Sequence, residues 1–179
     1  MVVALAGRRI DAPDATERRF PAEHVPEVTT RVRELFIELG ARALVTSAAC
    51  GADLIALDVA GDLNLRRRII LPFDAAQFRE MSVIDRPGPW GKAFDRIINE
   101  VTAAGDLRIV GSGSGEPAFE GTNQIILDEA YGVRTQLGCA AVAVIVWNGR
   151  SRGPNDFTAQ FRELAKRRGL RIYDVSTLT

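Results

Sequence analysis

Hydrophobic residues alternate along the chain between short unbroken runs and longer segments with helical spacing. Six runs are expected to form β-strands: residues 2–6, 43–46, 66–73, 107–110, 140–147 and 170–175. Between them, five segments place apolar residues roughly three to four positions apart, the spacing of an amphipathic helix. These segments are residues 25–39, 54–63, 90–101, 121–137 and 157–165. The chain is therefore predicted to alternate strands with helices over its whole length.

The expected strands are unbroken apolar runs rather than alternations of apolar and polar residues. Strands of this kind are buried on both faces, which is typical of a parallel sheet covered by helices on both sides. The pattern predicts an α/β fold, a three-layer α/β/α sandwich with a mainly parallel sheet of about six strands. No internal repeat or low-complexity tract interrupts the pattern, so residues 1–179 are expected to form a single domain.

Two connections, residues 74–90 and 111–121, are longer than such units usually need, and we expect loops there. Long loops at a sheet of this kind favour lids or binding loops. The glycines of residues 111–116, GSGSGE, lack the G-x-G-x-x-G spacing of a dinucleotide-binding turn. They favour a flexible surface loop, with the next helix beginning near Gly121.

Composition and charge exclude several classes of protein. Lys and Arg together number 23, as do Asp and Glu, so no net field attracts nucleic acid or an anionic membrane surface. The longest apolar run, residues 139–147, is too short to span a bilayer. Two cysteines and one histidine support neither a disulfide framework nor a structural zinc site, and they suit a reducing cytoplasm. No metal, cofactor, nucleic-acid or membrane partner is expected, and assembly into a homo-oligomer is left open.

Candidate ligand contacts follow the first two expected strands, because parallel sheets bind ligands beyond the carboxyl ends of their strands. After the first strand, Gly7 allows a close backbone approach, and Arg8 and Arg9 offer guanidinium donors that suit phosphate. After the second strand, small residues lead into a helix start, whose free N–H groups and dipole attract anions. The residues predicted to contact the ligand there are Ser47, Ala48, Cys50, Gly51, Ala52 and Asp53.

The same small residues have a second interpretation, tight packing of a helix against the sheet, and the stretch taken alone favours neither. Asp53, in the first helical turn, would then only stabilise the helix start. Cys50 near a helix N-terminus has the position of a nucleophile. The single histidine, His24, has no motif around it that marks a base. Cys50 is therefore expected to be a small buried residue, and no catalytic residue is assigned.

Further candidates lie near two later helix starts. Asn123 is close to the helix expected from Gly121, as a ligand contact or as a plain cap. Trp147 offers a ring for stacking on a base, or it simply ends the sheet. The residues around the following helix start form a second candidate anion site. They are Gly149, Gly153 and Thr158.

Several of these stretches taken together resemble the SLOG superfamily. They are GRRIDAP (7–13), SAACGAD (47–53), LPF (71–73) with the downstream SVIDRPGPW (82–90), and VWNGRSRGPNDFT (146–158). That superfamily groups the lonely-guy proteins, the DprA-like domains of DNA processing and related Rossmann-like nucleotide sensors. The most similar branch occurs in bacterial signalling proteins, beside tetratricopeptide repeats or nucleotide cyclases. The resemblance covers nearly the whole chain, from Val2 to about Ile172.

The resemblance implies a Rossmann-like domain that binds a nucleotide or nucleotide-derived ligand in one pocket, lined by residues 7–9, 47–53 and 147–158. The phosphoribohydrolase members carry a PGG-x-GT-x-x-E motif whose glutamate is catalytic. Here the paired glycines are replaced by Asn155 and Asp156, and the glutamate position, three residues past the threonine, holds Phe161. An apolar ring cannot assist cleavage of a glycosidic bond. A sensor domain without its own chemistry is therefore expected.

Two alternatives stay open. A phosphoribohydrolase of the lonely-guy type would need another acid in place of the lost glutamate, and the candidates are Asp53, Asp128, Glu129 and Asp156. A scaffold that dimerises through its helices would need no ligand at all.

Overall fold

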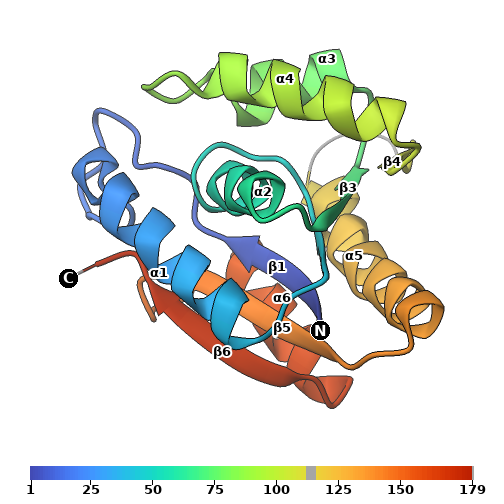
Figure 1. Ribbon diagram of the computed structural model, residues 1–179. Coiled ribbons are helices and arrows are strands. Elements are labelled where there is room, and N and C mark those ends of the chain that lie inside the picture. Colours follow the sequence, from blue (N-terminus) through green and yellow to red (C-terminus); the bar gives the residue numbers. More distant parts are fainter. Residues whose placement is uncertain (112–115, 179) are drawn as a thin grey trace.

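A six-stranded parallel sheet forms the middle layer of the protein (Figure 1). The computed structural model describes residues 1–111 and 116–178, with the backbone alone at 116 and 117. The strands are β1 (Val2–Gly7), β2 (Ala43–Thr46), β3 (Arg66–Leu71), β4 (Leu107–Ile109), β5 (Ala141–Trp147) and β6 (Arg171–Ser176). Their order across the sheet is β4-β3-β2-β1-β5-β6. The predicted α/β fold, a Rossmann-like three-layer sandwich, is confirmed.

Helices cover both faces of the sheet. They are η1 (Ala22–His24, a 3-10 turn), α1 (Val25–Glu38), α2 (Ala52–Asp62), α3 (Ala75–Ser82), α4 (Trp90–Ala103), α5 (Glu116–Leu137) and α6 (Phe157–Arg167). In Figure 1, α1 and α2 lie on one side of the sheet, and α5 and α6 lie on the other. Helix α4 packs against α2 and against the strands β3 and β4, and α3 packs against α4.

Alternate residues of the central strand β1 serve the two faces of the sheet. Val3 and Leu5 are fully buried in the core beneath α1, α2 and α4. Val2 and Ala4 are fully buried in the opposite core, beneath α5 and α6. Burial on both faces explains why the strand is an unbroken apolar run.

The order of the strands creates a switch point beside β1. From β1 the chain adds β2, β3 and β4 on one side, and it later returns to place β5 and β6 on the other. Helices therefore leave the neighbouring strands β1 and β5 on opposite faces, and a crevice is left at their carboxyl ends. The residues after β1 and β5 meet at this crevice.

The expectation of a loop over residues 74–90 is wrong in its first half, which forms α3. Asp74 caps this helix, because its carboxylate accepts a hydrogen bond from the backbone N–H of Gln77 at 2.9 Å. Phe78 on α3 is 1% exposed and stacks on Phe94 of α4, with 6.1 Å between ring centroids. The helix is too short to show a clear apolar period, so the cap was the available signal.

The helix expected near Gly121 begins earlier, at Glu116. Residues 112–115, where the loop GSGSGE was predicted, lie outside the described residues. The early start matters for the site, because it puts Phe119 and Thr122 on a helix at the crevice.

Small residues let the segment after β1 pack directly against the start of α2. A Cβ atom on Gly7 would lie 2.3 Å from the Cβ of Ala52, and one on Gly51 would lie 2.7 Å from the carbonyl oxygen of Arg8. Gly51 also has a φ of +92°, which side-chain-bearing residues rarely adopt. These residues therefore serve tight packing, the second interpretation of the stretch 47–53.

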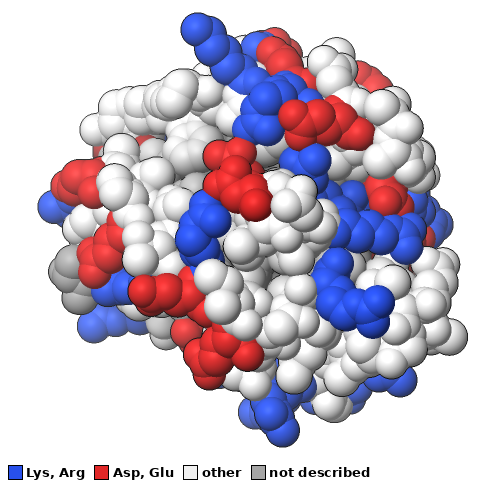
Figure 2. All heavy atoms as spheres, viewed as in Figure 1, with Lys and Arg blue, Asp and Glu red and all other residues white. Residues whose placement is uncertain are grey.

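The surface carries charges of both signs. Figure 2 shows Lys and Arg side chains interspersed with Asp and Glu side chains over the face viewed in Figure 1. Within the described residues, none of the helices combines the length and apolar character needed to cross a bilayer.

Gly51→Ala is expected to destabilise the fold strongly. The new Cβ would press on the backbone after β1, which costs about 1–3 kcal/mol of unfolding free energy on top of about 1 kcal/mol of strain from the positive φ. Gly105→Ala is the matched control, because Gly105 has a φ of +73° and no heavy atom within 4 Å of its added Cβ. Urea unfolding of both variants measures the difference. Equal losses would show that the packing at Gly51 is not tight.

Candidate functional site

A cavity of about 660 Å³ lies at the crevice beside the carboxyl end of β1. Its walls come from the segment after β1, the turn before α2, helix α3 and the connection that follows it, the start of α5, and the segment between β5 and α6. The predicted ligand contacts that line it are Gly7, Arg8, Arg9, Ser47, Asp53, Asn123 and Thr158. The volume suits a ligand of nucleotide size, since small-molecule sites measure about 300–1,000 Å³.

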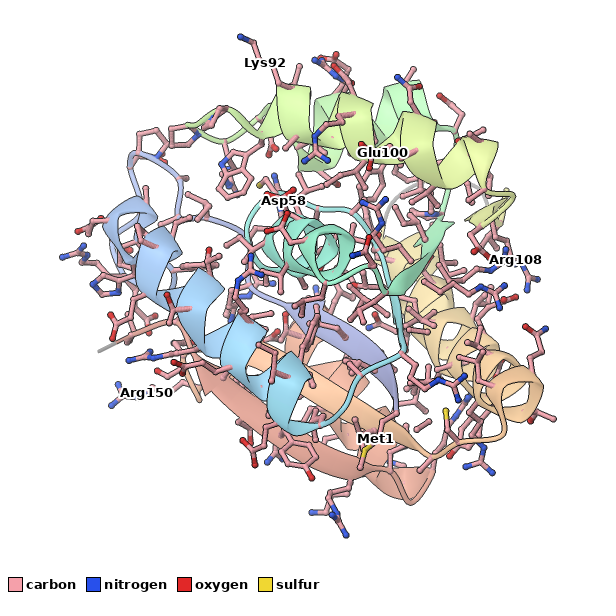
Figure 3. All side chains as sticks on the ribbon, viewed as in Figure 1. Met1, Asp58, Lys92, Glu100, Arg108 and Arg150 are labelled. Carbon is pink, nitrogen blue, oxygen red and sulfur yellow. The ribbon has the colours of Figure 1, made fainter. Side chains whose placement is uncertain are left out.

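The guanidinium group of Arg8 is hydrogen-bonded to several groups of the protein. Nη1 and Nη2 donate to the two carboxylate oxygens of Asp156 at 2.6 and 2.8 Å. Nε donates to Oδ1 of Asn148 at 3.2 Å, and Nη2 also donates to the carbonyl oxygen of Arg150 at 2.5 Å. This last contact uses the backbone of Arg150, whose side chain points away from the molecule in Figure 3. Arg8 thus joins the end of β1 to the segment before α6, and its donors are engaged within the protein.

Asp156 combines that ion pair with the N-cap of α6. Its carboxylate accepts hydrogen bonds from the backbone N–H groups of Thr158 and Ala159, each at 3.1 Å, and from that of Arg152 at 2.7 Å. Burial alone would raise the pKa of Asp156, but the hydrogen bonds from Arg8 and from the backbone lower it to about 2. Asp156 is therefore a charged structural group near neutral pH and is unsuited to donate a proton.

Further guanidinium groups gather around the same cavity. Burial lowers the pKa of Arg152 from its ordinary value, and the carboxylate of Asp156 opposes that shift. Repulsion between like charges lowers it further, through the guanidinium groups of Arg8, Arg19 and Arg9. The cavity is thus lined by cations close enough to repel one another.

Arg19 reaches the cavity because the segment between β1 and η1 folds back on itself. The carboxylate of Asp11 accepts hydrogen bonds from the backbone N–H of Arg19 at 2.9 Å and from that of Phe20 at 3.0 Å. Phe20 is fully buried and anchors the far end of the segment. The turn carries Arg19 to the cavity wall.

Asp53 is the buried acid of the cavity wall. Its side chain is 7% exposed, and one carboxylate oxygen accepts a hydrogen bond from the backbone N–H of Ala49 at 3.2 Å. Burial raises the pKa of Asp53 to about 7, against the opposing effects of Ala49, Arg9 and Thr46. Asp53 is therefore able to hold or release a proton near neutral pH.

Three backbone N–H groups in the turn that leads into α2 are already engaged. Ala49 donates to the carboxylate of Asp53, and Cys50 donates to the last carbonyl of α3 at 3.0 Å. Ala52 donates to the carbonyl of Arg8 at 3.1 Å. Much of the place predicted for a bound anion thus has acceptors from the chain itself.

Cys50 lies in this packed turn and is fully buried. Burial raises the pKa of its thiol, an effect larger than the opposing one of the Arg9 guanidinium group. The thiol therefore stays protonated near neutral pH and is unsuited to act as a nucleophile, as expected from the sequence.

The acids proposed to replace the missing glutamate lie in different places. Asp53 borders the cavity, and Asp156 is held by Arg8. Glu129 on α5 is paired with Arg68 and with Arg108. Asp128 on α5 is paired with Arg168 beyond the end of α6, 2.5 Å away. Among the described residues that line the cavity, Asp53 is the one member of this set able to donate a proton near neutral pH.

Aromatic rings form the apolar part of the cavity wall. Phe119 on α5 and Phe157 at the start of α6 have ring centroids 5.7 Å apart, and Phe78 on α3 also borders the cavity. A planar base packs well against such rings. The cavity therefore offers an apolar wall and a cationic wall to one ligand.

A second cavity, of about 490 Å³, lies between α5 and α6. It contains Trp147, Gly153 and again Asn123. The ring of Trp147 lies 5.8 Å from the guanidinium carbon of Arg8 and 5.6 Å from that of Arg162. The residues implied by the family resemblance for one pocket are therefore divided between two cavities.

The other predicted contacts belong to the packing or to exposed turns. Within the described part of the chain, five of them line neither cavity: Ala48, Cys50, Gly51, Ala52 and Gly149. Arg152 and Phe157 line the cavity and fall within the range 147–158 that the resemblance implied for the pocket. Sequence analysis assigned no contact to four other lining residues, namely Arg19, Phe78, Arg86 and Phe119. The prediction that residues 74–90 form a lid or a binding loop was the available signal for Phe78 and Arg86.

In comparisons with known proteins, the sequence matches no family model and no curated protein. In the regions that the structure describes, no cluster of three or more His, Cys, Asp or Glu side chains is arranged to hold a metal ion. The interpretation of the site therefore depends on its geometry and charge.

Asp53→Asn is expected to remove a pH dependence of folding stability. The folded-state pKa of about 7 lies above the ordinary value of 3.8. The protonated carboxyl group therefore favours the folded chain below about pH 4, and this contribution is lost as the pH rises to about 7. The loss is of the order of 4 kcal/mol, at about 1.36 kcal/mol per pKa unit. Urea unfolding near pH 4 and pH 8 should show the variant gaining stability over the parent only at the higher pH.

Asp58→Asn is the control for this measurement. Asp58 lies on the same helix, and its exposed side chain is paired with Arg96 on α4 at 2.6 Å. Figure 3 shows Asp58 on the side of α2 that faces α4, where Glu100 also pairs with Arg96. This variant should keep the pH dependence of the parent. If Asp53→Asn also kept the pH dependence of the parent, the conclusion that the pKa of Asp53 is raised in the folded protein would be wrong.

Proposed function

We propose that the cavity beside β1 binds a nucleotide or a nucleotide-derived ligand, and that the chain is a sensor domain without its own chemistry. The observation that carries the proposal is the pairing of mutually repelling guanidinium groups with an aromatic wall, at the switch point of a parallel sheet. Switch points are where open parallel sheets bind their ligands. A phosphate relieves the repulsion between guanidinium groups, and the aromatic wall receives the base.

The anionic part of the ligand lies against Arg152 and Arg19 in this proposal. Arg152 is well suited, because among the described residues its guanidinium group has a single ion pair, a long 3.9 Å approach to Asp156, which leaves donors for a phosphate. The turn before α2 instead offers Ser47 and Asp53 to hydroxyl groups of a ribose. The phosphate is not proposed to lie over the start of α2, where the amides of Ala49, Cys50 and Ala52 are engaged.

The resemblance to the SLOG superfamily implies the same class of ligand, and membership in that superfamily is part of the proposal. So is a role in a bacterial signalling protein of the cytoplasm. In this proposal the partner of the protein is its small-molecule ligand. Binding of the ligand is the signal, and the segments that contact the ligand transmit it.

Isothermal titration with AMP, ADP, ADP-ribose and cyclic AMP tests the proposal. At least one of them should bind, and Arg152→Gln should weaken its binding about tenfold or more, because a charge-assisted hydrogen bond is lost. Arg171→Gln is the control, since Arg171 is exposed on β6, where it contacts Tyr173. If none of the four compounds bound to well-folded protein, the proposal would be overturned.

A second candidate function is a phosphoribohydrolase, and the position of Asp53 favours it. Cleavage breaks the bond between the base nitrogen and C1′ of the ribose, water adds to C1′, and the base leaves with a proton. Asp53, with a pKa of about 7 in the cavity wall, is able to supply that proton. This candidate ranks below the sensor because Phe161 occupies the position of the family's glutamate.

Free adenine released from AMP, followed by chromatography, tests this candidate. Asp53→Asn should lower the rate by about a hundredfold or more, as expected for loss of a general acid, while Asp58→Asn should leave it unchanged. Release of adenine at the parental rate by Asp53→Asn would show that Asp53 is not the acid. Absence of release at any pH between about 5 and 8 would leave the sensor function.

A further inference from the structure

The carboxylate of Asp85 is shared between two guanidinium groups that line the cavity. Asp85 lies in the connection between α3 and α4, and its Oδ1 accepts a hydrogen bond from Nη2 of Arg9. Its Oδ2 lies 3.6 Å from Nη1 of Arg86, the next residue. One negative charge thus faces two positive charges, and the cluster keeps a net positive charge.

Each of these two arginines has a donor that the chain leaves unused. Nε of Arg9 and Nε of Arg86 are both buried from solvent, and neither has a hydrogen-bond partner among the residues that the structure describes. The thiol next to Arg9, that of Cys50, is only a weak acceptor. A buried donor without a partner is unfavourable, so two of them at one cavity point to a missing acceptor.

The side-on edge of a guanidinium group, formed by Nε and one Nη, matches two oxygens of a phosphate. In Arg9, Nη2 belongs to this edge and is directed to Asp85, while Nε is unpaired. The carboxylate therefore occupies part of the edge of Arg9 that a phosphate would use. In Arg86 it is Nη1, on the other side of the group, that faces Asp85, while Nε is again unpaired. Both side chains are about one-third exposed, at 30% each, so a ligand in the cavity is able to reach them.

We propose that Arg9 and Arg86 form a second anion subsite, filled by Asp85 in the free protein, and that the ligand is a nucleoside diphosphate or another nucleotide with two phosphate groups. The inference rests on the proposed function and names its ligand class. One phosphate lies against Arg152 and Arg19. The other displaces the carboxylate of Asp85 and accepts from Nε and Nη of Arg9 and Arg86.

In this proposal Asp85 weakens ligand binding, whereas a residue that holds a binding group in place strengthens it. Because its carboxylate competes with the ligand for the same donors, removing its charge should strengthen binding. The two arginines attract the second phosphate only, so their removal should weaken binding of a diphosphate and leave a monophosphate unaffected. These two expectations separate a subsite from a structural ion pair.

Isothermal titration of AMP and ADP against the parent and four variants tests the inference. Arg86→Gln should weaken ADP binding about tenfold and change AMP binding less than about twofold. Asp85→Asn should strengthen ADP binding about threefold or more, with AMP again unchanged. Arg96→Gln and Asp58→Asn are matched controls, because they remove the same charges from an exposed pair between α2 and α4. Circular dichroism and urea unfolding establish that each variant is folded.

The outcomes distinguish this inference from the function on which it rests. If AMP and ADP bind the parent equally and Arg86→Gln changes neither, the second subsite is overturned and the sensor function stands. Weaker ADP binding by Asp85→Asn would also overturn the inference, since Asp85 would then hold the arginines in place. If neither nucleotide, nor ADP-ribose or cyclic AMP, binds the folded parent, the proposed function itself fails.

Discussion

The buried pair between Arg8 and Asp156 is the interaction on which the cavity depends. It joins the residue that follows the central strand β1 to the segment that follows β5, and both side chains are buried. Removing one partner of such a pair leaves a buried charge uncompensated, at a cost of about 3–5 kcal/mol. The cap of α6, the position of Arg152 and the hydrogen bond from Thr158 to the carbonyl of Gly7 at 3.2 Å all depend on the same contact. Two walls of the cavity are therefore set by one ion pair.

Much of the fold could be predicted from the sequence, because the central strands β1, β2 and β5 are buried on both faces and so appear as unbroken apolar runs. The signal weakens in the edge strands β4 and β6, which are partly exposed and carry charged residues. It also weakens at the start of β3, where three arginines are only partly buried. Helix α3 escaped prediction because its boundary is set by a single cap at Asp74, and eight residues carry little periodicity. The early start of α5 escaped because glycines precede it.

The candidate site was predicted less completely, and for a physical reason. The sequence marks where a helix follows a strand, but it does not show whether the groups at that place are already engaged with one another. The guanidinium group of Arg8 and the amides of Cys50 and Ala52 were predicted to contact an anion, and these groups are hydrogen-bonded within the chain. Arg19 and Arg86 come to the cavity from segments with distant partners, since the hydroxyl of Thr177 donates to the carbonyl of Arg19 and Asp85, next to Arg86, accepts from Arg9. The local sequence pattern does not show such contacts between residues that are far apart in the chain.

The central place of β1 has a consequence for the order in which the protein assembles during synthesis. The strand is made before both of its neighbours: β2 follows within about forty residues, but the other edge pairs with β5, which begins at Ala141. Until then, the nascent chain exposes an apolar strand edge of the kind that promotes aggregation. Arg8 and Asp156 are 148 residues apart, so the cavity closes only after the segment that carries Asp156 has left the ribosome. Formation of the cavity therefore marks the point at which β1 has both of its neighbouring strands.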